Sequence, residues 1–210
     1  MKPLPLAALV AAAALSTLIV LDIIWNAQHP DQAGPWVDAE GEPALARITT
    51  VVHVVLYALL AAALIRYGRA IDGGLRFVRV VRWIIAAGYA MFAVLFCWLI
   101  IDPTFGTDGI YGIISTVAFA VTLLVPIALG FALLRRREFR VPALLLVAPV
   151  AVFPLVFVLE AFTDYAHPGY LETVVNFGVA LLCVAASALT TASAERPTDV
   201  AVSSTEAAAA

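Results

Sequence analysis

Six apolar stretches dominate the chain, and each is long enough to cross the hydrocarbon core of a membrane. A bilayer core about 30 Å thick needs about 20 residues of helix, because each residue adds 1.5 Å. Within lipid, a helix satisfies all of its own backbone hydrogen-bonding groups. We therefore predict an all-α fold, a polytopic integral membrane protein built as a bundle of six transmembrane helices. The spans are expected at about 4–25, 45–66, 80–101, 110–134, 141–162 and 171–193.

The composition agrees with this class. Hydrophobic residues make up 63% of the chain and charged residues 13%, whereas soluble domains are about half apolar and a quarter charged. The first stretch is longer than the apolar core of a secretory signal, and Trp25 and Asn26 stand where a cleavage site would need small residues. We therefore expect a retained anchor. Residues 1–194 should form the transmembrane domain and residues 195–210 a disordered cytoplasmic tail.

The basic residues gather in the connections on one side of the predicted bundle. Eleven of the 12 lie there: Lys2, Arg66, Arg69, Arg76, Arg79, Arg82, Arg135, Arg136, Arg137, Arg140 and Arg196. Only Arg47 falls on the opposite side. By the positive-inside rule, both termini lie in the cytoplasm (N-in, C-in), and the spans form three hairpins joined on the outside.

The opposite connections are acidic, which is consistent with this orientation. They contain Asp31, Asp38, Glu40, Glu42, Asp108 and Asp164. The arginine-rich composition is typical of a GC-rich bacterial genome, so the expected location is the cytoplasmic (inner) membrane. The basic loops should attract anionic lipids of the bilayer, and we expect no nucleic-acid partner. The sequence does not indicate a protein partner.

A similar short sequence motif lies near the start of the second, fourth and sixth spans. Its three copies are Thr49–His53, Ser115–Phe119 and Glu172–Asn176. The spacing suits one hairpin per repeating unit, as in many transporters, although helices rich in valine and alanine also match by chance. Small and polar residues share one face of each of these three helices, so we expect them to line the interior of the bundle.

Three prolines lie inside predicted spans, and each removes a backbone donor. Pro126 falls in the fourth span, and Pro149 and Pro154 fall in the fifth. Such residues tend to kink a helix. The kinks are either tolerated by packing, or they form a hinge or open a cavity beside the fourth and fifth helices.

Ionisable side chains inside a membrane are costly, which makes each one a functional hypothesis. His53 is the deepest, and Asn176 enters the sixth span to a similar depth. The remaining candidates lie nearer the outer surface. The full set of candidate ligand-binding residues is Asp22, Arg47, His53, Glu160, Glu172 and Asn176. We predict that they form a polar vestibule open to the outside.

Three functions fit such a vestibule. It could bind or pass a small solute, a proton or a lipid from the outer face, since histidine exchanges protons near neutral pH and arginine binds carboxylate or phosphate. It could be a structural cluster of an accessory subunit, in which Arg47 pairs with Glu172 or Asp22 and His53 bonds a backbone carbonyl. It could also be a membrane-embedded enzyme that uses His53 and the outer carboxylates.

Known catalytic and cofactor motifs do not occur in the sequence. It contains neither H-E-x-x-H nor G-x-S-x-G, and it lacks a glycine-rich phosphate loop. Haem in a helical bundle usually takes paired histidines, and only His53 lies within a span. His29 and His167 could approach a metal ion from the outer loops, but the spacing does not favour a metal site. We therefore predict no cofactor and no metal.

Overall fold

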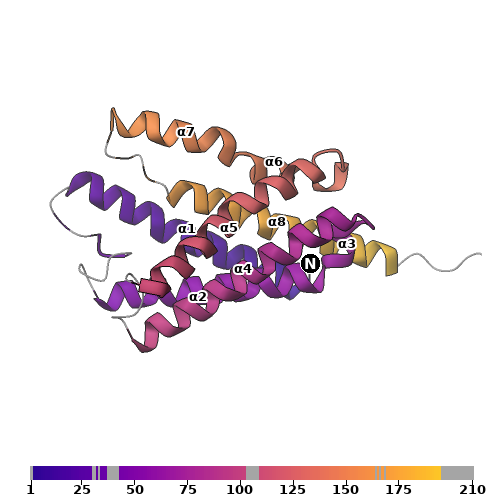
Figure 1. Ribbon diagram of the computed structural model, residues 1–210, viewed down its shortest axis with the longest axis horizontal. Helices are drawn as coiled ribbons and strands as arrows, with labels where there is room; N and C mark the ends of the chain where they lie inside the picture. The colour runs from indigo at the N-terminus through magenta and orange to yellow at the C-terminus, as the bar shows by residue number, and fades with distance from the viewer. Residues whose placement is uncertain are drawn as a thin grey trace, which may run out of the picture.

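The computed structural model describes residues 2–29, 32, 34–36, 43–102, 109–163, 165, 167 and 169–194. These residues are almost entirely helical (Figure 1). The elements are α1 (Pro3–Gln28), α2 (Pro43–Arg66), α3 (Gly68–Asp72), α4 (Arg76–Ile101), α5 (Gly109–Leu133), η1 (Arg137–Phe139), α6 (Arg140–Val147), α7 (Pro149–Glu160) and α8 (Gly169–Ala194). The predicted tail, Arg196 and the six acidic residues of the outer connections lie outside the described residues.

Six segments of the described chain are long and apolar enough to cross a membrane. They are α1, α2, α4, residues 112–133 of α5, the run of η1, α6 and α7, and residues 169–192 of α8. The predicted six-helix bundle is confirmed, and the protein belongs to the class of multi-pass α-helical membrane proteins. The helix of the third span, α4, begins at Arg76, four residues before the predicted start of that span.

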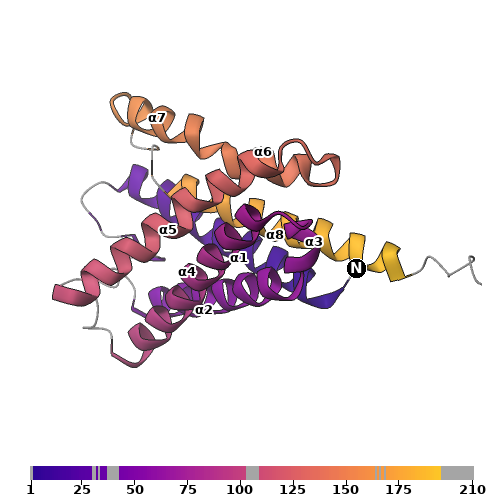
Figure 2. The ribbon, with the colours of Figure 1, turned by 45° about the vertical axis from the view of Figure 1, so that its right-hand side comes forward.

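The fifth span is divided where one of the three prolines lies. Residue 148 separates α6 from α7, and Pro149 occupies the first turn of α7, where its missing N–H is tolerated. Pro126 and Pro154, by contrast, lie inside α5 and α7 without ending them. Only Pro149 therefore coincides with an interruption. Figures 1 and 2 show that α7 lies at the edge of the bundle, and its side chains are mostly exposed.

The second, fourth and sixth spans are the more buried ones. The buried share is 44% for α2, 39% for the span in α5 and 50% for that in α8. It is 33% for α1 and 28% for both the α4 span and the α6–α7 span. The prediction that the even spans line the interior is confirmed. Although α4 is exposed on one side, its other face packs closely on both α2 and α5.

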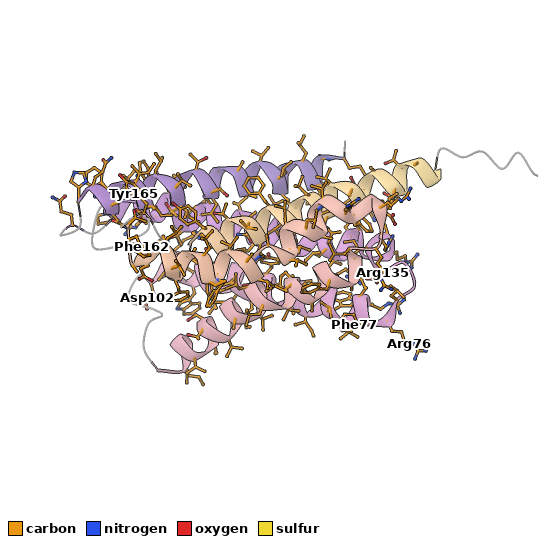
Figure 3. The ribbon with its side chains drawn as sticks, turned by 90° about the horizontal axis from the view of Figure 1, so that it is seen from above. Arg76, Phe77, Asp102, Arg135, Phe162 and Tyr165 are labelled. Atoms are coloured by element: carbon orange, nitrogen blue, oxygen red, sulfur yellow. The ribbon has the colours of Figure 1, made fainter. Side chains whose placement is uncertain are left out.

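The basic connections and both ends of the described chain lie at one end of the bundle. Lys2 Nζ donates a hydrogen bond to Thr190 Oγ1 near the end of α8, at 3.0 Å. Arg136 donates to the carbonyls of Ala70 and Ile71, which joins two basic connections. Figure 3 shows Arg76 and Arg135 at this arginine-rich end.

The opposite end, called the loop end below, carries Asp102, Phe162 and Tyr165 (Figure 3). The ends of α1, α4 and α7 and the starts of α2, α5 and α8 lie there, as the ribbon in Figure 1 shows. The identity of the membrane and the compartment that each end faces stay predictions of the positive-inside rule.

Candidate functional site

A buried histidine and a carboxylate lie together where α2 meets α8, in the half of the bundle nearer the loop end. His53 Nδ1 lies 2.8 Å from the carbonyl oxygen of Thr49, one turn earlier in α2. Because a carbonyl only accepts hydrogen bonds, Nδ1 is the donor in this contact. The other ring nitrogen, Nε2, lies 3.7 Å from Oε1 of Glu172, and the Glu172 side chain is 19% exposed.

Only one of the two carboxylate oxygens of Glu172 contacts a polar group of the residues that the structure describes. Oε1 accepts a hydrogen bond from Tyr57 Oη at 2.5 Å and from Asn176 Nδ2 at 3.3 Å, besides facing His53. Tyr89 Oη donates to Asn176 Oδ1 at 3.1 Å, which fixes the amide. Oε2 makes no hydrogen bond or ion pair with any described residue. The cluster therefore leaves one carboxylate oxygen available to a ligand.

Aromatic rings surround the polar cluster on the α2 and α4 side. Phe96 stacks on the His53 imidazole, with ring centroids 4.6 Å apart and planes 7° apart. Tyr57 stacks on Tyr89 at 5.5 Å and on Phe92 at 5.2 Å. Ring faces carry partial negative charge and attract cations. The rings therefore hold the imidazole in place and give its surroundings a preference for positive charge.

A cavity of about 280 Å³ opens onto this cluster. Its lining includes His53, Tyr57, Phe92, Phe96, Phe119 and Glu172. A second cavity of about 10 Å³ shares Tyr57, Phe119 and Glu172 and reaches Asn176. That volume is close to the minimum for one water molecule. The lining of neither cavity includes an α8 residue beyond Asn176, so both lie in the half of the bundle nearer the loop end.

Three of the six predicted candidates come together in this cluster, namely His53, Glu172 and Asn176. The other three lie elsewhere. Asp22, which is 5% exposed, accepts hydrogen bonds from the backbone N–H of Trp36 at 2.9 Å and from the side chain of Asn26. These two hydrogen bonds satisfy the buried carboxylate, and the one from Trp36 connects α1 to the segment that follows it in the chain.

Arg47 and Glu160 are both exposed, and neither forms an ion pair or hydrogen bond with a described residue. The interpretation that Arg47 pairs with Glu172 or Asp22 is therefore not borne out. His29 bonds the carbonyl of Trp25, and His167 accepts from the backbone N–H of Gly169. Within the described ranges, no three His, Cys, Asp or Glu side chains gather closely enough to hold a metal ion.

The aromatic residues of the site were not among the predicted candidates, although their spacing carries a signal. Tyr89, Phe92 and Phe96 lie three and four residues apart, which is the spacing of one helix face. The repeated sequence motif also points to the site. Its residues His53 and Phe119 line the larger cavity, and Phe119 and Asn176 line the smaller one. The internal repeat itself stays a prediction.

A second buried polar cluster lies at the arginine-rich end. Arg82 is only 4% exposed, although the sequence analysis placed it in a basic connection. Its Nε and Nη2 donate to the two carboxylate oxygens of Asp72 at 2.8 and 3.1 Å, and its Nη1 donates to the carbonyl of Leu64 at 3.1 Å. A side chain at Gly68 would collide with the guanidinium. The turn after α2 folds over Arg82 because a glycine stands there.

Comparisons of this chain with protein-family models, with curated proteins and with solved structures found no match. The function is therefore inferred from the chemistry of the described residues, which comprises a carboxylate with one oxygen unbonded among them, a buried imidazole and a cavity with aromatic walls.

Proposed function

We propose that this membrane protein binds a small cationic solute, which enters from the loop end and occupies the cavity between α2, α4, α5 and α8. One observation carries the proposal. Glu172 lines the cavity and keeps Oε2 without a partner among the described residues, while the surrounding wall is aromatic. A carboxylate oxygen beside ring faces suits an ammonium group, which gains both an ion pair and cation–π contacts.

Size and charge narrow the class of solute. Pockets for drug-sized ligands measure about 300–1,000 Å³, so a cavity of about 280 Å³ suits a smaller molecule. An anion would face the Glu172 carboxylate, and Arg47, the basic residue predicted to receive it, lies exposed outside the cavity lining. A small amine or quaternary ammonium compound fits the lining best.

The membrane-embedded enzyme is less well supported. Neither Asp22 nor Glu160 lines the cavity that His53 and Glu172 share, so Glu172 is the one carboxylate among the described residues of its lining. The purely structural function makes a different prediction, namely that no solute binds. The experiment below separates these possibilities.

The test uses purified protein in detergent and measures the shift of the unfolding temperature with choline and with its uncharged isostere 3,3-dimethylbutanol. We expect choline to stabilise the wild type, the isostere to have little effect, and Glu172→Gln to lose the stabilisation. The matched control is Glu160→Gln, which removes an exposed carboxylate of α7 and should keep it. Equal shifts with both compounds, or no shift from choline and tetramethylammonium alike, would refute the proposal.

A further inference from the structure

A cavity of about 460 Å³ lies at the arginine-rich end, between the end of α2, α3 and the start of α4. Three arginines and one acid contribute to its lining: Arg69, Arg79, Arg82 and Asp72. It therefore carries two positive charges in excess. Nothing in the proposed solute site involves this cavity, which lies at the opposite end of the bundle.

Two of the three guanidinium groups remain available to a ligand. Arg82 is occupied, because it bonds both oxygens of Asp72 and the carbonyl of Leu64. Arg79 is 57% exposed in its side chain and reaches Asp72 only at 3.5 Å. Arg69 is exposed and pairs with no described acid. Guanidinium groups bind phosphate through paired hydrogen bonds.

The cavity also borders a surface that faces lipid when the spans cross a membrane. Ile65 of α2 and Trp83 of α4 line it and are 51% and 49% exposed. Tryptophan is enriched where the hydrocarbon region meets the headgroups. An apolar flank next to free arginines suits a molecule with both an anionic group and an acyl chain. We propose that this cavity binds the phosphate group of an anionic phospholipid, whose chain lies along Ile65 and Trp83.

The segment that carries these arginines, α3 and the turn after it, is fixed by hydrogen bonds without a lipid. Arg136 donates to the carbonyls of Ile71 at 2.7 Å and Ala70 at 3.2 Å, which satisfies the end of α3. Gly73 and Gly74 close the turn with φ of 52° and 84°, a region that glycine adopts without strain. A preformed site loses less conformational freedom on binding.

The experiment compares two double variants that remove the same charge from the same end of the protein. Arg69→Gln/Arg79→Gln changes the cavity, whereas Arg135→Gln/Arg137→Gln changes exposed arginines that are not part of its lining. Native mass spectrometry of the full chain measures binding of phosphatidylglycerol, phosphatidylcholine and inorganic phosphate. We expect the wild type to prefer phosphatidylglycerol to phosphatidylcholine. An arginine near a membrane surface contributes about a factor of five, so the cavity variant, which loses two, should bind about 25-fold more weakly.

Three results would overturn the proposal. Equal losses in the two double variants would indicate a diffuse electrostatic attraction. Binding of inorganic phosphate as tight as that of phosphatidylglycerol would indicate an anion site without a lipid. No preference between the two lipids would remove the site altogether. If the double variant fails to fold, Arg69→Gln alone tests the same site with an expected loss of about fivefold, since its side chain bonds no other described residue.

Discussion

The two buried polar clusters of this protein differ in how completely their polar groups are used. At the arginine-rich end, the Asp72 carboxylate and the Arg82 guanidinium bond each other through two contacts, and a third contact uses the carbonyl of Leu64. In the other half of the bundle, Glu172 directs one oxygen to Tyr57, Asn176 and His53, and the other oxygen has no partner among the described residues. A satisfied cluster holds helices together, whereas an incompletely satisfied one beside a cavity is suited to a ligand.

Burial makes this difference energetically important. A buried charge with its partner removed is strongly unfavourable, while a pair that satisfies itself has little left for other molecules. An unused acceptor in a low-dielectric cavity, by contrast, gains most from a ligand that supplies the missing donor. The predictions below test whether the two clusters differ in this way.

The largest effect is expected for Arg82→Ala. The substitution leaves Asp72 buried and without its main partner, which costs about 3–5 kcal/mol. The free energy of unfolding in detergent, from denaturant titration, provides the measurement. Arg79→Ala is the control, because its exposed side chain reaches Asp72 only at 3.5 Å, and it should cost no more than about 1 kcal/mol. Equal losses would mean that Arg82 does not hold this end of the bundle together.

Glu172→Gln should show the opposite pattern. The glutamine oxygen still accepts from Tyr57 and Asn176, so the free energy of unfolding should change by less than about 1 kcal/mol. Affinity for choline, measured by titration calorimetry, should nevertheless fall about 30-fold, because loss of a charged partner in a buried site costs about 2 kcal/mol or more. A destabilisation comparable to that of Arg82→Ala would make both clusters structural.

Arg47→Gln should have the smallest effect. Its side chain is exposed and makes no contact with a described polar group, so both stability and choline affinity should stay within about 0.5 kcal/mol of the wild type. The two assays used for Glu172→Gln measure this. A large loss of binding would bring Arg47 into the solute site and restore the wider vestibule that the sequence predicted.

Part of the site could be predicted from individual residues, because ionisable groups in a membrane stand out. Depth and residue type single out His53 and Asn176, and Glu172 is one of the candidates nearer the outer surface. Arg82 was interpreted as a loop residue, since no local pattern shows that Gly68 lets the chain fold over its guanidinium. Asp22, Arg47 and Glu160 were grouped with the site because, like Glu172, they lie nearer the outer surface than His53 does. Depth in a helix does not determine which neighbours a side chain meets.

The sequence alone determined the class of the fold and the interior helices. Six runs of about 20 apolar residues leave the backbone only one way to satisfy its hydrogen bonds in lipid, and the small and polar faces of the even spans favour helix contact. The tertiary structure decided which polar groups meet. The pairing of His53 with Glu172, the aromatic wall contributed by α4 and the burial of Arg82 depend on how helices far apart in the chain pack together. That packing arises from the combined fit of many side chains, and periodicity within one helix carries no record of its partner.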